Sequence, residues 1–191
     1  MKGDLRCFIA IKIEGAMARR LERENSFLKL SGAQAGWTAE RNLHLTLRFI
    51  GEVHPEEVIP LGELIEEEAA ATPASRLMLK GLHTLPLESA RPRIVAVGVE
   101  GDLEPIEDLY RRLQKGLRGL GFKPEKQAFH PHVTLARIKG EKNVDRLLEK
   151  VASAAGREFG HLQVREIQLM MSDLEIEGPI YTPLQVFPLL G

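Results

Sequence analysis

The sequence is poor in cysteine and in long apolar runs. Cys7 is the only cysteine, so the chain has neither an intrachain disulfide nor a cluster of thiolate metal ligands. The longest run without a charged residue, 178–191, has 14 residues and includes three prolines, whereas a membrane helix needs about 20. Lys2, Asp4 and Arg6 interrupt the apolar residues near the N-terminus, which argues against a secretory signal. We therefore expect a cytoplasmic protein without a membrane span.

An excess of one charge is also absent. Lysine and arginine total 26 against 27 aspartate and glutamate, a net charge of −1. The chain as a whole should not attract nucleic acid, so any contact must come from a local patch or one bound phosphate. Hydrophobic residues make up 43% of the 191 residues, enough for a sizeable core. We expect one folded domain, 1–191, or two closely joined lobes.

The pattern of apolar residues predicts an α+β fold. Strands are expected at 5–13, 43–50, 76–85, 93–99, 132–138, 161–170 and 181–189, and helices at 15–30, 55–71, 102–118 and 142–155. Both halves show the same order of strands and helices. That order fits an internal duplication, although any α+β protein alternates in this way, so it leaves the question open.

Two similar tetrapeptides carry the chemistry. The segments 44–47 and 132–135 share the pattern His, apolar, Thr, Leu within expected strands, 88 residues apart. With six histidines and six threonines in the chain, two such pairs by chance are an event on the order of 1%. Alternation along a strand places each histidine and its threonine on one face. The alternative is that each pair merely satisfies its own hydrogen bonds on a half-buried strand.

A pair of histidines suits acid–base chemistry near neutral pH. With an ordinary pKa near 6.5, one imidazole can accept a proton while the other donates one. A threonine hydroxyl beside each imidazole can donate a hydrogen bond to a phosphoryl oxygen during in-line displacement. Such a site requires no metal.

With their surroundings, the motifs resemble those of the two-histidine (2H) phosphoesterases. The segments that carry the resemblance are NLHLTLRFIGEV at 42–53, FHPHVTLARIK at 129–139 and GPIYTPLQVF at 178–187. They are most similar to the RNA 2′,3′-cyclic phosphodiesterases, first described as 2′-5′ RNA ligases. The resemblance spans the whole chain.

The resemblance implies a fold and a reaction. The fold is two pseudo-symmetric, intertwined lobes, each an antiparallel sheet with helices on its outer face, and the active-site cleft lies between them. The reaction is metal-independent opening of a 2′,3′-cyclic phosphate to a 2′-phosphate, with His132 as base, His44 as acid, and Thr46 and Thr134 as phosphate ligands. The reverse direction joins such an end to a 5′-hydroxyl as a 2′-5′ bond. No cofactor, membrane or protein partner is implied, and a monomer is expected.

Two arginines are weaker candidates for substrate binding. Strict alternation places Arg48 on the face of His44 and Thr46, where it could contact a phosphate or ribose. The same rule turns Arg137 away from the cleft unless a bulge intervenes, and it assigns Phe49 to the core. The alternative for Arg48 is a solvated strand end.

Several other residues have both a functional and a plain structural reading. Lys123 and Lys126 could guide RNA, although exposed lysines are common, while Phe129 and Trp37 could stack on bases or pack in the core. Cys7 is expected to be a small buried hydrophobe.

Two rival functions remain open at this point. His130 and His132, together with His44, could form a three-histidine metal site of a metal-dependent phosphoesterase. The chain could also be a non-catalytic module that binds RNA ends, although binding alone needs no acid–base pair.

Overall fold

The computed structural model describes residues 4–87, 89, 91–125, 128–175 and 178–191. Its helices are α1 (Gly15–Lys29), α2 (Val58–Ala70), α3 (Glu104–Gly119) and α4 (Val144–Ser153), with short 3-10 helices η1 (Glu40–Asn42) and η2 (Pro55–Glu57). The strands are β1 (Leu5–Lys12), β2 (Ala35–Trp37), β3 (His44–Val53), β4 (Ser75–Leu85), β5 (Ile94–Gly101), β6 (His132–Ile138), β7 (Glu158–Val164), β8 (Glu166–Glu175) and β9 (Gly178–Pro188). The expected α+β class is confirmed.

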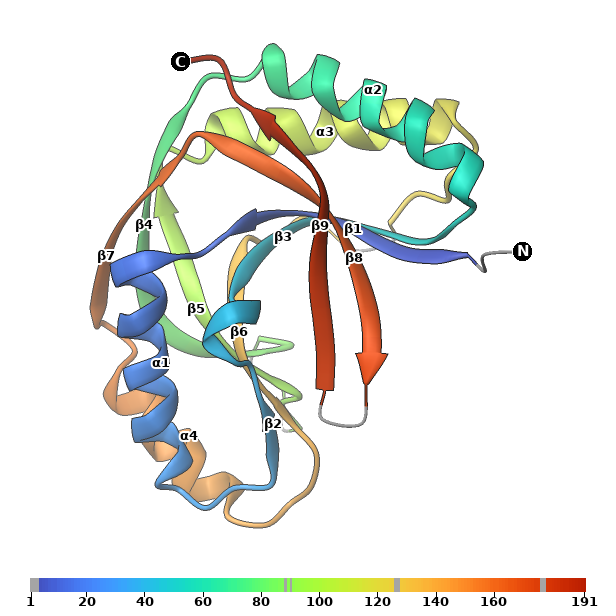
Figure 1. Cartoon of the computed structure of the whole chain (residues 1–191). Helices are drawn as coiled ribbons and strands as arrows, with labels where there is room; N and C mark the ends of the chain where they lie inside the picture. The colour runs from blue at the N-terminus through green and yellow to red at the C-terminus, as the bar shows by residue number, and fades with distance from the viewer. Residues whose placement is uncertain (1–3, 88, 90, 126–127, 176–177) are drawn as a thin grey trace.

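All the strands join in one antiparallel sheet that consists of two lobes. The sheet order is β7-β4-β5-β6-β3-β1-β8-β9, with β2 added to β6. We call β3, β1, β8 and β9 the first lobe, and β6, β5, β4, β7 and β2 the second lobe. Within the sheet, the two lobes are joined by the pairing of Leu45 on β3 with Val133 on β6. Helices α2 and α3 pack on the first lobe, and α1 and α4 pack on the second, at separate corners of the molecule (Figure 1).

The two halves of the chain exchange elements between the lobes. Strand β4 comes after the first motif in sequence but pairs with β5, whereas β8 comes after the second motif and pairs with β1. Helix α3 likewise lies against β3, and α1 lies against β7. Neither lobe is therefore a continuous piece of the chain.

The expected strand 161–170 is in fact two strands. Strand β7 ends at Val164 and pairs with β4, whereas β8 begins at Glu166 and pairs with β1. Arg165 is the point at which the chain crosses from the second lobe to the first. An unbroken run of strand-forming residues does not reveal a change of pairing partner, because propensity reports extended backbone and not its neighbours. The short strand β2 was also missed by the sequence prediction.

The main core lies between the sheet and its helices. Helix α3 illustrates the pattern, since Ile106, Leu109, Leu113 and Leu117 form one fully buried stripe at helical spacing. On β1, residues with odd numbers such as Ile9 join this core. The even-numbered positions face the other way, and there Phe8 and Ala10 form a second small cluster with Met170. This second face of the sheet carries the motif histidines.

No helix in the described part of the chain has the length and apolar character needed to cross a membrane.

Candidate active site

The two motifs lie on neighbouring strands at the junction of the lobes. Leu45 and Val133 pair directly and are fully buried, while the histidine and threonine of each motif are only partly buried. Because successive side chains of a strand point to opposite faces, both His–Thr pairs lie on the face away from the helices. The structure thus places all four residues predicted from the motifs at one junction.

A β-bulge occurs at the last residue of each motif, Leu47 and Leu135. One step along β1, from Ala10 to Ile9, spans two steps along β3, from Thr46 to Arg48. On β6 the same irregularity occurs. Thr134 pairs with Ala96 and Ala136 pairs with the adjacent Val95, so Leu135 is skipped. The bulge leaves Arg48 and Ala136 on the same face as Leu47 and Leu135, so that the residue after each of them lies on the motif face. The order of buried, partly buried and exposed residues is therefore the same over the first six positions of β3 and of β6.

The bulge corrects the expected position of Arg48. Its side chain is 3% exposed and points away from the motif face. The guanidinium donates hydrogen bonds to the carbonyl oxygens of Phe49 (2.6 Å) and Lys123, and lies 3.4 Å from a carboxylate oxygen of Glu125. The expectation that Arg48 faces the cleft is wrong, because strict alternation fails at Leu47.

The same irregularity brings Phe49 and Arg137 to the motif face. Each lies five residues after a motif histidine, and Phe49 is 53% exposed, so its expected place in the core is also wrong. Arg137 is exposed and lines a cavity together with Phe49. The bulge that was the condition for Arg137 to face the cleft is present.

Both histidines are held by the same backbone contact. Nδ1 of His44 lies 2.7 Å from the carbonyl oxygen of Asn42, and Nδ1 of His132 lies 2.7 Å from that of His130. A carbonyl oxygen only accepts hydrogen bonds, so in each ring Nδ1 carries the proton and donates it. In the neutral ring Nε2 is then the free base. Nε2 is thus the atom that can accept a proton in one imidazole and, once protonated, donate a proton in the other.

Asn42, whose carbonyl oxygen accepts the hydrogen bond from His44, is itself hydrogen-bonded to β9. Asn42 is buried, and its Nδ2 donates a 2.7 Å hydrogen bond to the carbonyl oxygen of Pro179 on β9. Strand β9 therefore helps to fix the backbone that orients His44.

Burial lowers the pKa of both motif histidines. For His44, desolvation is the main cause, partly offset by the Asn42 hydrogen bond, and the nearby charges of Lys12, Arg137 and His132 lower the pKa further. For His132, desolvation again dominates, the hydrogen bond to His130 opposes it, and the charges of His130 and Arg137 add to the lowering. The free site therefore favours neutral imidazoles.

One cavity lies beside His44. We call it the His44-side cavity; its volume is about 520 Å³, and its lining includes Phe8, Phe49, Arg137 and Tyr181. The rings of Phe8 and Tyr181 lie 5.0 and 5.2 Å from the His44 ring, centroid to centroid. Aromatic faces and a cation thus surround the acid–base group, which suits a base and a phosphate.

A second cavity lies beside His132. This His132-side cavity, of about 580 Å³, is lined by both Thr46 and His132 and by Phe49, Phe129 and His130. Phe49 borders both cavities and separates them. Residues of both motifs therefore line the His132-side cavity, whereas the His44-side cavity adjoins His44 through the rings of Phe8 and Tyr181.

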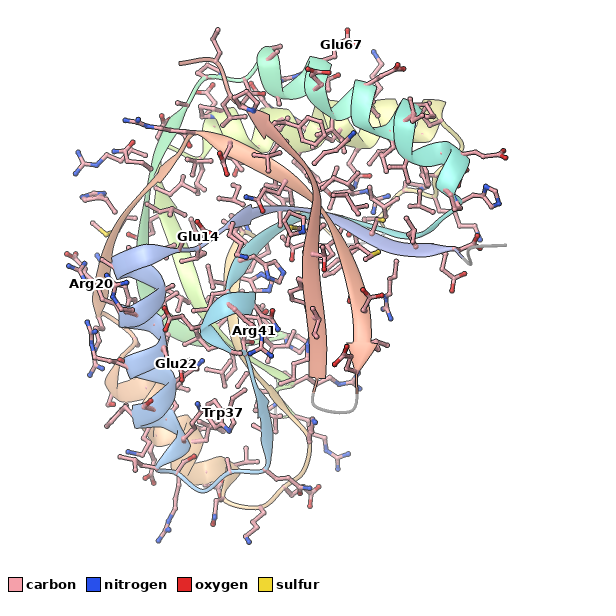
Figure 2. All side chains as sticks on the ribbon, in the orientation of Figure 1. Glu14, Arg20, Glu22, Trp37, Arg41 and Glu67 are labelled. Atoms are coloured by element: carbon pink, nitrogen blue, oxygen red, sulfur yellow. The ribbon has the colours of Figure 1, made fainter. Side chains whose placement is uncertain are left out.

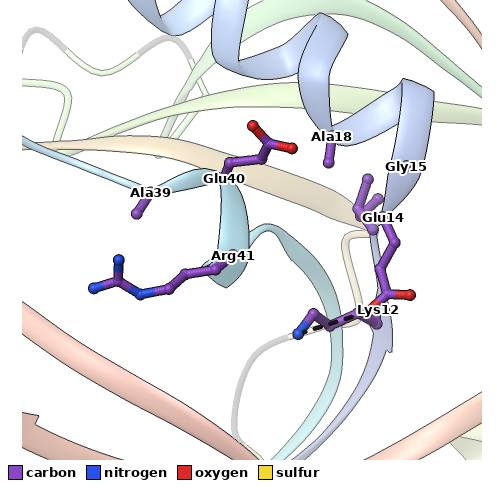
Figure 3. Close-up of a pocket in the computed structure, with 8 residues that line it drawn as sticks. Lys12, Glu14, Gly15, Ala18, Ala39, Glu40 and Arg41 are labelled. Carbon is purple, nitrogen blue, oxygen red and sulfur yellow. Dashed lines mark ion pairs between the residues drawn. The ribbon is translucent and has the colours of Figure 1, made fainter.

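A third cavity, of about 460 Å³, lies between the end of β1, the start of α1 and η1 (Figure 3). Lys12, paired in register with His44, forms one side of it, and Arg41 forms another. Lys12 lies 3.9 Å from Glu14. No sequence motif indicated this cavity.

The other candidates have mostly structural positions. Trp37, on β2 (Figure 2), is half-buried against the main core, and Cys7 is buried with its pKa raised to about 11 by desolvation. Lys123 contributes its carbonyl oxygen to Arg48. Lys126 lies outside the described residues. Phe129 packs against the core and also lines the His132-side cavity.

Within the described residues, no group of three or more histidine, cysteine or carboxylate side chains is arranged to hold a metal ion. His83, His130 and His132 form a row, with ring centroids 5.8 and 6.2 Å apart.

A model of the 2′-5′ RNA ligase superfamily matches residues 23–175 of the chain. The chain belongs to this superfamily. A relative from Aeropyrum pernix, an RNA 2′,3′-cyclic phosphodiesterase, is 38% identical over 168 residues, covering 88% of this chain and 94% of the relative. A phosphodiesterase of the same name from Methanothermobacter thermautotrophicus is 31% identical over 185 residues, covering 97% of this chain and 99% of the relative.

Solved structures of the superfamily have the same fold. The apo form of Escherichia coli LigT superposes with a TM-score of 0.81 at 25% identity, over the full length of both chains. TT0787 of Thermus thermophilus gives 0.80 at 26%, covering 97% of this chain and 98% of that one. This member of the 2′-5′ RNA ligase superfamily thus shares its whole architecture with both.

Sequence reasoning missed three contributors to the site. Phe8 and Tyr181 lie against His44 although they come from β1 and β9, and Asn42 anchors it through a backbone atom. Tyr181 and Asn42 left a signal, because they lie in the segments 178–187 and 42–53 that carry the resemblance.

Proposed function

We propose that this enzyme opens the 2′,3′-cyclic phosphate at RNA ends, or in small cyclic nucleotides, to leave a 2′-phosphate. The RNA 2′,3′-cyclic phosphodiesterases of Aeropyrum pernix and Methanothermobacter thermautotrophicus, as relatives, support the activity. The observation that carries the mechanism is the matched anchoring of His44 and His132 through Nδ1, on strands that pair at the lobe junction.

In the proposed reaction, Nε2 of His132 removes a proton from water as the water oxygen attacks phosphorus. The bond between phosphorus and O3′ breaks, and protonated His44 supplies its Nε2 proton to O3′. The net result is addition of one water across the P–O3′ bond. An anionic cyclic phosphate opposes the pKa lowering that burial imposes, and so favours the one protonated histidine that the reaction needs.

The neighbouring polar groups stabilise the phosphate. Thr46 and Thr134 lie on the same face as the histidines, and their hydroxyl groups donate hydrogen bonds to the non-bridging oxygens. Arg137, whose charge acts on both histidines, neutralises the developing negative charge on those oxygens. No metal or nucleotide cofactor takes part, and the site is complete in a monomer.

The same groups also catalyse ligation, with a different nucleophile. A 5′-hydroxyl replaces water at His132, and attack on the cyclic phosphate gives a 2′-5′ phosphodiester with a free 3′-hydroxyl. Recognition centres on the terminal phosphate and one or two nucleotides, because the chain has no net positive charge to hold long RNA.

The test is hydrolysis of a short RNA that ends in a 2′,3′-cyclic phosphate, in excess chelator, with the product's phosphate position identified. The unmodified protein is expected to give a 2′-phosphate, and His44→Ala and His132→Ala each lower kcat by about 10²–10⁴. His161→Ala, an exposed histidine on β7, is the matched control and keeps full activity.

Other outcomes favour the rival functions. Turnover that appears only when metal is restored would replace this mechanism with a metal-dependent one. Saturable binding of the cyclic end without any product would leave an RNA-end binding module.

A further inference from the structure

We propose that the His132-side cavity is the binding site for a second nucleoside, the one whose 5′-oxygen is joined in ligation and released in its reversal. The inference rests on the proposed function and identifies where the partner of the cyclic end is held. Hydrolysis uses Thr46 and His132 at the edge of this cavity but leaves its apolar part empty, because the nucleophile is a water molecule.

In-line geometry assigns the two cavities to opposite sides of phosphorus. The nucleophile enters opposite the departing O3′. His44 protonates O3′, so the ribose and base of the cyclic end lie on its side, against Phe8 and Tyr181. The nucleophile enters at His132, and the cavity that His132 lines lies on that side. A 5′-hydroxyl delivered to His132 brings its own nucleoside into this cavity.

The cavity has the size and lining of a nucleoside site. Its volume of about 580 Å³ falls within the roughly 300–1,000 Å³ of small-molecule pockets. Its walls are mostly apolar and include Leu85, Leu87 and Phe129. Leu87 is 57% exposed and Phe49 is 53% exposed. Flat apolar surfaces of this kind suit the faces of an unpaired base.

The aromatic wall is held in place before any ligand arrives. The Phe129 ring stacks on Tyr110 of α3, with centroids 4.5 Å apart and planes 14° from parallel. Tyr110 in turn accepts a 2.6 Å hydrogen bond from Gln114 and donates a weaker one to Glu125. A fixed ring loses little conformational entropy on stacking, so this wall is preorganised.

The charges at the rim fit the next phosphate of an RNA strand. Arg93 is exposed and lines the cavity, as does His130. Among the described residues of the lining, the carboxylate is Glu125, which lies 3.4 Å from the buried Arg48 guanidinium that balances its charge. A nucleoside bound through its 5′-hydroxyl directs its 3′-phosphate away from His132, and a cation at the rim is the group that would meet it.

Cleavage of a 2′-5′-linked dinucleotide, which is the reversal of ligation, allows the two nucleoside sites to be tested independently. In that step the 3′-hydroxyl gives its proton to His44 and attacks phosphorus. The P–O5′ bond breaks, and O5′ takes a proton from His132. Atoms balance with no further reactant. The dinucleotide places one nucleoside in each cavity, whereas the matching 2′,3′-cyclic mononucleotide has its one nucleoside in the His44-side cavity and only its phosphate against Thr46 and His132.

The experiment compares KM for these two substrates in Leu87→Ala, Arg93→Ala and the control Leu30→Ala. Leu30 is 76% exposed and lines none of the three cavities. Each cavity variant is expected to raise KM for the dinucleotide about 5- to 10-fold, which is the loss of affinity expected when one stacking or phosphate contact is removed. KM for the cyclic mononucleotide should change less than twofold, and Leu30→Ala should alter neither.

Three results would overturn the inference. They are an unchanged dinucleotide KM in both cavity variants, an equal rise for both substrates, or failure of the unmodified protein to cleave the dinucleotide while it hydrolyses the mononucleotide. Failure to hydrolyse the cyclic mononucleotide at all would instead reject the proposed function.

Discussion

Arg48 and Glu125 join the strand of the first motif to the loop that leads into the second. The Arg48 guanidinium lies 3.4 Å from Glu125 and also donates to the carbonyl oxygen of Lys123, 75 residues away in sequence. Glu125 completes the contact by accepting a 3.3 Å hydrogen bond from the Phe49 amide. One buried cation therefore connects the segments that carry the two motifs across the lobe junction.

Arg48→Ala is expected to lower the free energy of unfolding by about 1–3 kcal/mol. The substitution removes hydrogen bonds to two carbonyl oxygens and leaves these polar groups without their partner. Glu125 is partly exposed and can be solvated, so the loss stays below that of a fully buried ion pair. Denaturant unfolding measures the change. Arg19→Ala, an exposed arginine on α1, should change stability by less than about 0.5 kcal/mol, and an equally small change for Arg48→Ala would contradict the structural role.

The sequence predicted the faces of the two motifs correctly but not the directions of the residues after them. His44 to Thr46 and His132 to Thr134 obey alternation, which is a local property of extended backbone. The bulges at Leu47 and Leu135 depend on how β3 and β6 pair with their neighbours, so the periodicity of a single strand cannot show them. The bulges explain why the predicted directions of Arg48 and Phe49 were both wrong.

Longer-range features escaped prediction for a related reason. The positions of the helices were found because their apolar stripes are periodic, as in α3. The exchange of β4 and β8 between the lobes and the crossing at Arg165 depend on strand partners that are distant in sequence. The contact of Tyr181 with His44 depends on that exchange, because β9 pairs with β8, and the contact of Phe8 with His44 depends on the pairing of β1 with β3.

The two motif threonines should contribute to catalysis more than to folding. Thr46→Val and Thr134→Val each keep the side-chain shape but remove the hydroxyl that donates to phosphate. We expect kcat to fall by about 10²–10³ per substitution, with Ser restoring most of the rate. Steady-state kinetics with a cyclic mononucleotide measures the effect. Thr182→Val, an exposed threonine on β9, is the control, and equal losses in all three variants would point to a general structural effect.

Arg137 should be needed for phosphate binding in a way that lysine only partly replaces. A guanidinium can offer two parallel donors to a phosphate, whereas an ammonium acts as a point charge. Arg137→Ala is expected to lower kcat/KM by about 10- to 150-fold, the value of a charge-assisted hydrogen bond, and Arg137→Lys by less. Arg146→Ala, exposed on α4, should have no effect. Full activity in Arg137→Ala would remove the residue from the site.

Lys12 offers a way to tell which histidine is the acid. The free enzyme needs one neutral and one protonated histidine, so kcat/KM should have a bell-shaped pH profile. The acidic limb reports the pKa of the base, and the basic limb reports that of the acid. Burial lowers the pKa of both His44 and His132, so the bell should lie below the ordinary histidine pKa of about 6.5. A monoanionic substrate favours protonated imidazole, so the profile of kcat should lie at higher pH.

The charge of Lys12 lowers the pKa of His44 but is not among the causes that shift His132. Lys12→Met removes that charge, so the pKa of His44 should rise while that of His132 stays in place. If His44 is the acid, as proposed, the basic limb of kcat/KM moves to higher pH and the acidic limb does not. Movement of the acidic limb alone would make His44 the base and reverse the mechanism. Lys115→Met, exposed on α3, makes the same change in net charge and should leave both limbs unmoved. Parallel displacement of both limbs in Lys115→Met would show that net charge, and not proximity to His44, controls the profile.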